Sequence, residues 1–172
     1  MELEQIFFWL LALGATLTSI LVVLPPGGKN PLYGALALIL SFFFVAGLYV
    51  LLVAHLMAAL QIMVYAGAIM VLFTFVIMLL NLSKRELGEE SKTIAQGLGV
   101  AAMLVITVKA VLLVEASADG ISKRDMALDP GFGTVEAVGD LLFKEYLFPF
   151  ELAAVLLLVA IVGAIVLAKR TL

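Results

Sequence analysis

Residues 30–83 read NPLYGALALILSFFFVAGLYVLLVAHLMAALQIMVYAGAIMVLFTFVIMLLNLS, and this stretch decides the fold because it contains no Asp, Glu, Lys or Arg. A membrane-spanning helix needs about 20 apolar residues. The stretch is too long for one span and predicts two, at about 31–53 and 56–81, joined by a tight turn near Ala54 and His55. Asn30 and Pro31 suit the N-cap and the first turn of the earlier helix.

The remainder of the 172-residue chain has the same apolar character. Hydrophobic residues make up 65% and charged residues 13%, whereas soluble domains carry about 25% charged residues. A short chain in water does not bury that much apolar surface. In lipid the backbone must pair internally, as helices or a closed barrel, and the long unbroken apolar runs exclude a barrel. Further spans are predicted at 5–24, 93–114 and 147–168, so residues 1–172 are predicted to form one all-α, polytopic membrane domain with five transmembrane helices.

The polar stretch 115–146 predicts one additional helix. Glu136, Asp140 and Lys144 recur at every fourth position. The apolar residues Val135, Val138, Leu141 and Leu142 lie on the opposite side of such a helix. This pattern is typical of a short amphipathic helix at the membrane interface, placed directly before the last span.

Five spans put the two termini on opposite sides of the membrane. The side of the C-terminus would hold six basic residues: Lys29, Lys84, Arg85, Lys92, Lys169 and Arg170. The side of the N-terminus would hold three: Lys123, Arg124 and Lys144. The positive-inside rule therefore predicts an external N-terminus and a cytoplasmic C-terminus.

The chain is poor in residues that carry chemistry. It has no Cys and one His, which excludes disulfides, thiolate metal sites and a multi-His metal site. A net charge of -3 without a basic tract gives no indication of nucleic-acid binding. Lys109 and Glu151 are candidates for an ion pair near the outer membrane face; a snorkelling lysine and a proton relay are the other readings. His55 is either interfacial or a proton site.

The third span contains the most informative residues. Ala66, Gly67 and Ala68 allow another backbone to approach closely, while Gly67 also weakens the helix, so tight packing and a hinge are both open. The span is longer than the hydrocarbon requires, and an extra residue is readily absorbed as a π-bulge. The Tyr65 hydroxyl needs a partner, which is a neighbouring subunit, a water or a nearby carbonyl.

Residues 61–81, with VYAGAIMVLF at positions 64–73, resemble the subunit J family of bacterial NADH:quinone oxidoreductase, respiratory complex I, whose mitochondrial counterpart is NADH dehydrogenase chain 6. Asn30-Pro31, the segment 46–49 and the segment 142–153 extend the resemblance over most of the chain, and it is weak across 115–133.

The resemblance implies a non-catalytic, multi-pass subunit of a proton-translocating enzyme in the bacterial inner membrane, with no redox centre of its own. Other subunits would hold FMN, the iron–sulfur clusters and the quinone cavity, and the chain would lie beside that cavity and the first proton channel. The family's third helix has a π-bulge whose conversion to α-helix opens a water path toward glutamates of adjacent subunits. Carried over, the gate would comprise Val64, Tyr65, Ala66, Gly67, Ala68, Met70 and Phe73.

Two readings from other classes remain open at this point. One is a small ion-conducting or antiporter-associated membrane protein without redox partners, and the other is a passive assembly scaffold. The sequence specifies neither the quinone nor the electron donor, which in relatives of the complex is NADH, ferredoxin or another carrier.

Overall fold

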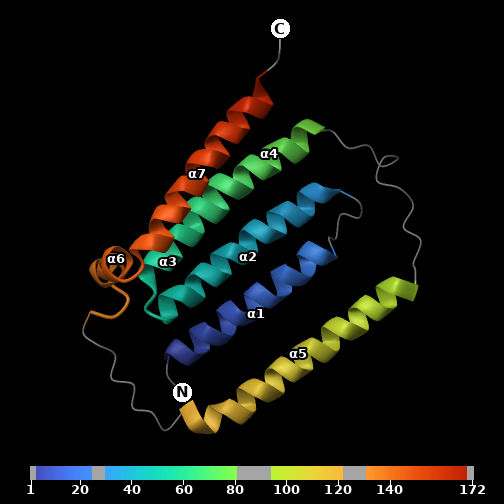
Figure 1. Ribbon diagram of the computed structural model, residues 1–172. Helices are drawn as coiled ribbons and strands as arrows, with labels where there is room; N and C mark the ends of the chain where they lie inside the picture. Colours follow the sequence, from blue (N-terminus) through green and yellow to red (C-terminus); the bar gives the residue numbers. More distant parts are fainter. Residues whose placement is uncertain (1–2, 25–29, 81–93, 122–130, 170–172) are drawn as a thin grey trace.

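The computed structural model describes residues 3–24, 30–80, 94–121 and 131–169, and within these ranges the chain is helical apart from short turns, with no strand. The helices are α1 (Leu3–Val23), α2 (Pro31–Leu51), α3 (His55–Leu60), the π-helix η1 (Gln61–Ile69), α4 (Met70–Leu80), α5 (Ile94–Ile121), α6 (Val135–Lys144) and α7 (Leu147–Ala168). The all-α prediction is confirmed. In Figure 1 the N-terminus lies at the same end as the α2–α3 turn and α6, and the C-terminus lies at the opposite end.

Four helices are long and apolar enough to cross a membrane: α1, α2, the continuous helix α3-η1-α4 over His55–Leu80, and α7. Their ends agree with four of the predicted spans to within two residues. The Asn30 side chain accepts a hydrogen bond from the Leu32 N–H at 3.0 Å, and Pro31 opens α2, as the sequence predicted. The cap and the proline together fix where the second span begins.

The predicted span 93–114 corresponds to α5, which is not among those four helices. Whether α5 crosses the membrane stays a prediction, because the side chains of most of its first residues lie outside the described part. The helix itself continues past Val114, the predicted end of the span, to Ile121. The segment Glu115–Ile121 is polar but contains good helix formers, and a helix needs no apolar face once it leaves the lipid.

Small residues hold α1 against α2. A Cβ on Gly14 would lie 2.5 Å from Cε1 of Phe44, and a Cβ on Gly47 would lie 2.8 Å from Cδ2 of Leu11. Each helix therefore offers a glycine on which a large side chain of the other rests, and the backbones come close. Between these helices the Ser19 and Ser41 hydroxyls are 3.2 Å apart and share a hydrogen bond.

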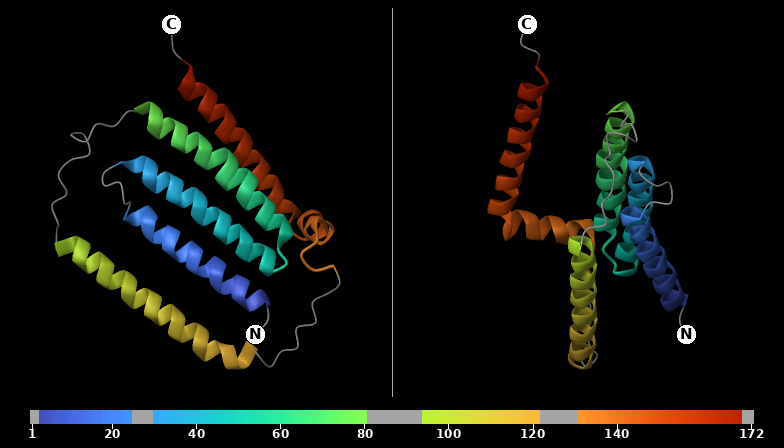
Figure 2. Two further views of the ribbon diagram at one scale, coloured as in Figure 1. Left: turned by 180° about the vertical axis from the view of Figure 1, so that it is seen from behind. Right: turned by 90° about the vertical axis from the view of Figure 1, so that its right-hand side faces the viewer.

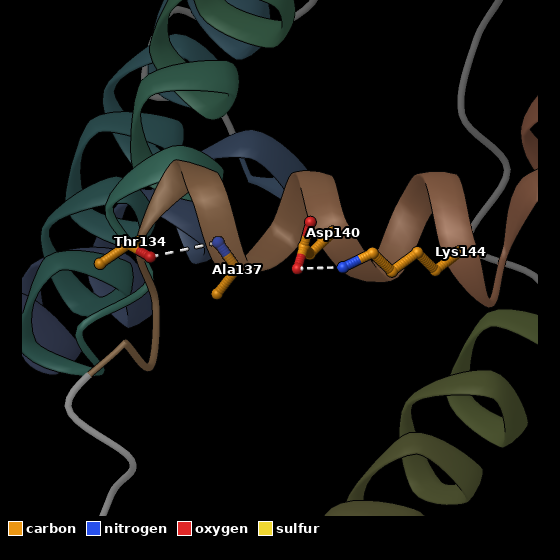
Figure 3. A network of polar contacts seen from close by, with 4 residues as sticks. All are labelled: Thr134, Ala137, Asp140 and Lys144. Atoms are coloured by element: carbon orange, nitrogen blue, oxygen red, sulfur yellow. Dashed lines mark hydrogen bonds and ion pairs between the residues drawn. The ribbon is translucent and has the colours of Figure 1, made fainter.

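The helix α6 lies across the direction of the long helices, as the right-hand view of Figure 2 shows, and it packs against the start of α7. Thr134 caps it, since its hydroxyl accepts from the Ala137 N–H at 3.2 Å, and Asp140 pairs with Lys144 at 2.7 Å on the exposed side (Figure 3). The predicted helix is present here; its position at a membrane interface is not tested by its geometry.

Few of the side chains that the structure describes are buried within this single chain. The buried apolar residues are all small or flexible, namely Ala35, Ala46, Ala58, Ala66 and Met70. No described side chain of α7 is buried, and every described side chain of α5 is exposed. Large exposed apolar surfaces of this extent indicate lipid or partner chains as the surroundings.

Candidate functional site

The third span changes its helical form in the middle of its length. After the six residues of α3, the nine residues Gln61–Ile69 form the π-helix η1, and the N–H of Met70 donates to the carbonyl of Tyr65, five residues earlier. Helices of this type are rare, and short π segments inside α-helices cluster at functional sites. The π form that the length of the span allowed is therefore present, and it extends over nine residues.

One face of this span packs on α2, which contacts α3, η1 and α4 in turn. Ala58, Ala66 and Met70 are the buried residues of that face, with 5%, 4% and 5% exposure. The small alanines permit the close approach that membrane helices use. Ala66 thus serves packing, as the more conservative reading of the small-residue cluster expected.

Gly67 is exposed, and the one atom near a Cβ built on it belongs to its own helix and not to α2, so its surroundings differ from those of buried Ala66. A Cβ at Gly67 would lie 3.1 Å from the Ile62 carbonyl oxygen, five residues earlier. This distance is tighter than most contacts of real Cβ atoms, so a side chain at position 67 would require the backbone of the π-helix to shift by a few tenths of an ångström. The contact concerns the form of the helix and not its packing on α2, so it supports the interpretation of Gly67 as a hinge.

The Tyr65 side chain contacts α2 through one aromatic residue. Its ring meets Phe42 edge to face, with centroids 6.0 Å apart and planes at 71°, and the residue is 49% exposed. Within the described part of the chain the Tyr65 hydroxyl has no hydrogen-bond partner. Of the partners that the sequence left open, the nearby carbonyl is thus not found, and a neighbouring subunit or a water remains.

The other predicted gate residues divide between surface and core. Val64, Ala68 and Phe73 are exposed, and Met70 is buried. The structure brings the seven residues together along one continuous helix, with five of them in η1 and Met70 and Phe73 in α4. Their action as a gate is not tested by these contacts.

The predicted pair of Lys109 and Glu151 does not meet in the isolated chain. Lys109 is on α5 and Glu151 on α7, both are exposed, and Figures 1 and 2 place the two helices apart. Among the described side chains, the ion pair that forms is Asp140–Lys144. His55 is exposed at the first position of α3. The described residues hold no group of three or more His, Cys, Asp or Glu that could bind a metal.

The sequence did not single out two features of this region. Thr74 in α4 has a buried hydroxyl oxygen without a partner among the described residues; a lone threonine in an apolar span was its only signal. Val53, between α2 and α3, has a positive φ of 60°. A valine gives no warning of that conformation, because β-branched residues rarely adopt it.

These features define a multi-pass, all-helical membrane protein with a π-helix inside one long span. Residues 18–167 match the family model described as NADH-ubiquinone/plastoquinone oxidoreductase chain 6. The chain belongs to this family, and its resemblance to subunit J of bacterial NADH:quinone oxidoreductase is confirmed. By family it is a membrane subunit of an oxidoreductase complex.

Relatives match along nearly the whole chain. NADH-quinone oxidoreductase subunit J of Rhodobacter capsulatus is 38% identical over 95% of this chain and 80% of its own length. F(420)H(2) dehydrogenase subunit J of Methanosarcina mazei is 36% identical over 97% and 92%. NADH-quinone oxidoreductase subunit J of Escherichia coli is 34% identical over 91% and 82%.

Proposed function

We propose that this chain is the membrane-arm subunit that couples quinone reduction to proton translocation through the register of its third span, without a redox centre of its own. The observation that carries the proposal is the π-helix Gln61–Ile69 inside a span of 26 residues. A helix that holds one residue more per turn converts to α-helix only by rotating one flank against the other. Such a rotation changes which side chains face the neighbouring subunits.

The composition of the site supports a gate rather than a reaction centre. The span lacks ionisable groups apart from Tyr65 and the terminal His55, so protons would be carried by carboxylates of adjacent subunits and by water. Exposed Val64, Tyr65, Ala68 and Phe73 would face those subunits and control the water between them. FMN, iron–sulfur clusters and quinone would be held by other chains, since this one offers no Cys ligand.

The relatives' names support a role that is independent of the electron donor. Relatives of similar identity are named for NADH, for NAD(P)H and for F(420)H(2). A subunit whose relatives are named for different donors is suited to a step that does not involve the donor, and we assign this chain to the coupling at the quinone end. We extend to this chain the donor class of the relatives, with NADH as the first to be tried.

The placement in the membrane follows from charge and exposure. We propose that the chain lies in the bacterial inner membrane with its N-terminus outside and its C-terminus in the cytoplasm. In this arrangement α5 is the fourth of five spans and α6 lies at the outer interface. The unburied helices α5 and α7 would be covered by the subunits that line the quinone cavity and the first proton channel. Lys109 and Glu151 would approach each other, or find other partners, only in that assembly.

The test is Gly67→Ala in the assembled complex. A Cβ at this position would lie 3.1 Å from the Ile62 carbonyl oxygen, so the π-helix must adjust to accept it. Overpacking costs about 1–3 kcal/mol, and about 1 kcal/mol against the π-helix would shift the equilibrium about fivefold toward α-helix. We expect fewer protons translocated per quinone reduced, measured in proteoliposomes, with the amount of assembled complex unchanged; Gly67→Val should act more strongly.

Gly139→Ala is the matched control, because nothing lies within 4 Å of the Cβ that it adds to α6, a helix outside the surfaces assigned above to partner subunits. It should leave the proton-to-quinone ratio unaltered. An assembled Gly67→Ala complex with normal pumping would reduce the chain to a scaffold. Flavin and iron–sulfur absorbance in the purified complex separates both outcomes from the ion-channel reading, in which no redox partners accompany the chain.

A further inference from the structure

The turn between the second and third spans has an unusual backbone. The N–H of Ala54 donates to the Tyr49 carbonyl at 2.9 Å, and the N–H of Val53 donates to the Val50 carbonyl at 3.0 Å. Val53 has φ 60°. This is the left-handed position after a helix end that glycine usually occupies, and a β-branched residue is strongly disfavoured there. Residues this far from their preferred conformation persist only where their surroundings hold them.

The residue that holds Val53 comes from a distant part of the chain. Gly133, with φ 77°, lies directly against Val53, and a Cβ at Gly133 would overlap the Val53 carbonyl oxygen. The same Cβ would be 3.0 Å from the Val53 carbonyl carbon. Both the dihedral angle and the contact thus require glycine at position 133. The segment before α6 therefore packs, through Gly133, against the strained turn at Val53.

An apolar groove extends this contact along α6. The groove has a volume of about 440 Å³ and is lined by residues of the α2 end, the start of α3 and the apolar side of α6, among them Tyr49, Leu52, Met57, Phe132, Val138 and Leu141. Figure 3 shows α6 beginning at the helices of the turn, at Thr134, and running away from them, with Lys144 at the far end. Apolar surface on three elements therefore faces the junction that Gly133 closes.

The strained turn is close to the π-helix. Only the six residues His55–Leu60 separate them, which is about 9 Å at helical rise. Ala58, in the middle of that segment, is buried with 5% exposure. A short helix fixed by its turn at one end and by a buried residue in its middle has little freedom to rotate.

We propose that Gly133 and Val53 form a clamp that anchors the first flank of the π-helix, so that a change from π-helix to α-helix rotates α4 and leaves α3 in place. One residue corresponds to about 100° of rotation, which α4 would take up. Gly133 and Val53 are positioning residues, since neither contacts the gate itself. The inference rests on the proposed coupling function and adds a direction to it: the end at the α2–α3 turn is fixed and the opposite end moves.

The experiment compares Gly133→Ala with Gly131→Ala in the assembled complex. Gly131 is in the same segment, but nothing lies within 4 Å of its added Cβ. Hydrogen exchange of the amides of residues 55–60, followed by mass spectrometry, reports the anchor without reference to activity. In Gly133→Ala it should rise about fivefold or more, the lower range of coupling between two sites in a protein, and protons translocated per quinone reduced should fall. Gly131→Ala should change neither.

Exchange that is the same in both variants would overturn the clamp. Raised exchange with an unchanged proton ratio would leave the clamp standing and overturn the coupling function on which it rests. Where Gly133→Ala fails to assemble, Phe132→Ala takes its place, because it removes an apolar contact of the groove without adding an atom that meets Val53. Unchanged exchange at residues 55–60 in that variant would likewise overturn the proposal.

Discussion

The backbone N–H of Met70 donates its hydrogen bond to the carbonyl of Tyr65, five residues back instead of four. Tyr65 therefore has two separate relations in the molecule. Its carbonyl closes the last bond of the π-helix, while its ring rests edge-on against Phe42 of α2. A substitution that keeps the ring and removes the hydroxyl leaves both relations intact and isolates the role of the oxygen.

We predict that Tyr65→Phe preserves assembly but slows coupled turnover. Tyr65 is half-exposed and its hydroxyl has no partner among the described residues of this chain, so the hydroxyl is available to a water or a polar group of a neighbouring subunit. Losing one such hydrogen bond costs about 1 kcal/mol, or about a fivefold change in an equilibrium that includes it. The measurement is quinone reduction together with proton uptake in membrane vesicles.

Tyr65→Leu is the comparison variant, because it also removes the contact with Phe42 and should lower the thermal stability of the complex. If Tyr65→Phe reduces quinone and pumps protons as the unchanged protein does, the hydroxyl has no part in coupling and Tyr65 serves packing alone.

The packing of α1 on α2 gives a prediction about stability. Gly14→Val should destabilise the complex by about 1–3 kcal/mol, the usual range for overpacking, since its Cβ alone would lie 2.5 Å from the Phe44 ring. Thermal melting of the purified complex measures this change. Adding Phe44→Leu should recover part of the loss, because the two residues are in contact and their effects are not additive. Equal losses with and without Phe44→Leu would contradict this account of the α1–α2 contact.

Local rules predicted the helices well and their special points poorly. Apolar run lengths placed the spans, and Asn30 with Pro31 placed the start of α2. The same rules ended the fourth predicted span at Val114 because polarity begins there, and alanine and glutamate continue the helix to Ile121. The apolar pattern predicts where a helix leaves the lipid, whereas the helix itself ends where its backbone hydrogen bonds end, and the two points differ.

The conformation of Val53 and its contact with Gly133 lie outside what local patterns encode. Gly133 has an evident local purpose, the turn before the Thr134 cap, so its second role against a residue 80 positions away is not visible in sequence. The π-helix could be predicted in part. The length of the span and Gly67 allowed it, and the resemblance to the family assigned it to the third span. Its extent over nine residues came only from the backbone.

The last prediction concerns Thr74, whose hydroxyl oxygen is buried against the packed face of α4 and has no partner among the described residues. A buried hydroxyl without a hydrogen bond costs about 1–3 kcal/mol. Valine has nearly the same shape and lacks the oxygen. Thr74→Val should therefore leave the melting temperature of the complex unchanged or raise it. The gain in stability should be at most about 1 kcal/mol, because polar side chains inside membrane proteins contribute little on average, about 0.6 kcal/mol per hydrogen bond.

Thr74→Ser is the informative control, since it keeps the hydroxyl and removes a methyl group, and it should lower stability by about 1 kcal/mol through the lost packing. The opposite ranking, with serine tolerated and valine destabilising, would mean that the oxygen is bonded in the assembled complex. In that case a water or a partner subunit reaches the α2–α4 contact one turn beyond the π-helix, and Thr74 joins the residues whose surroundings change when α4 rotates.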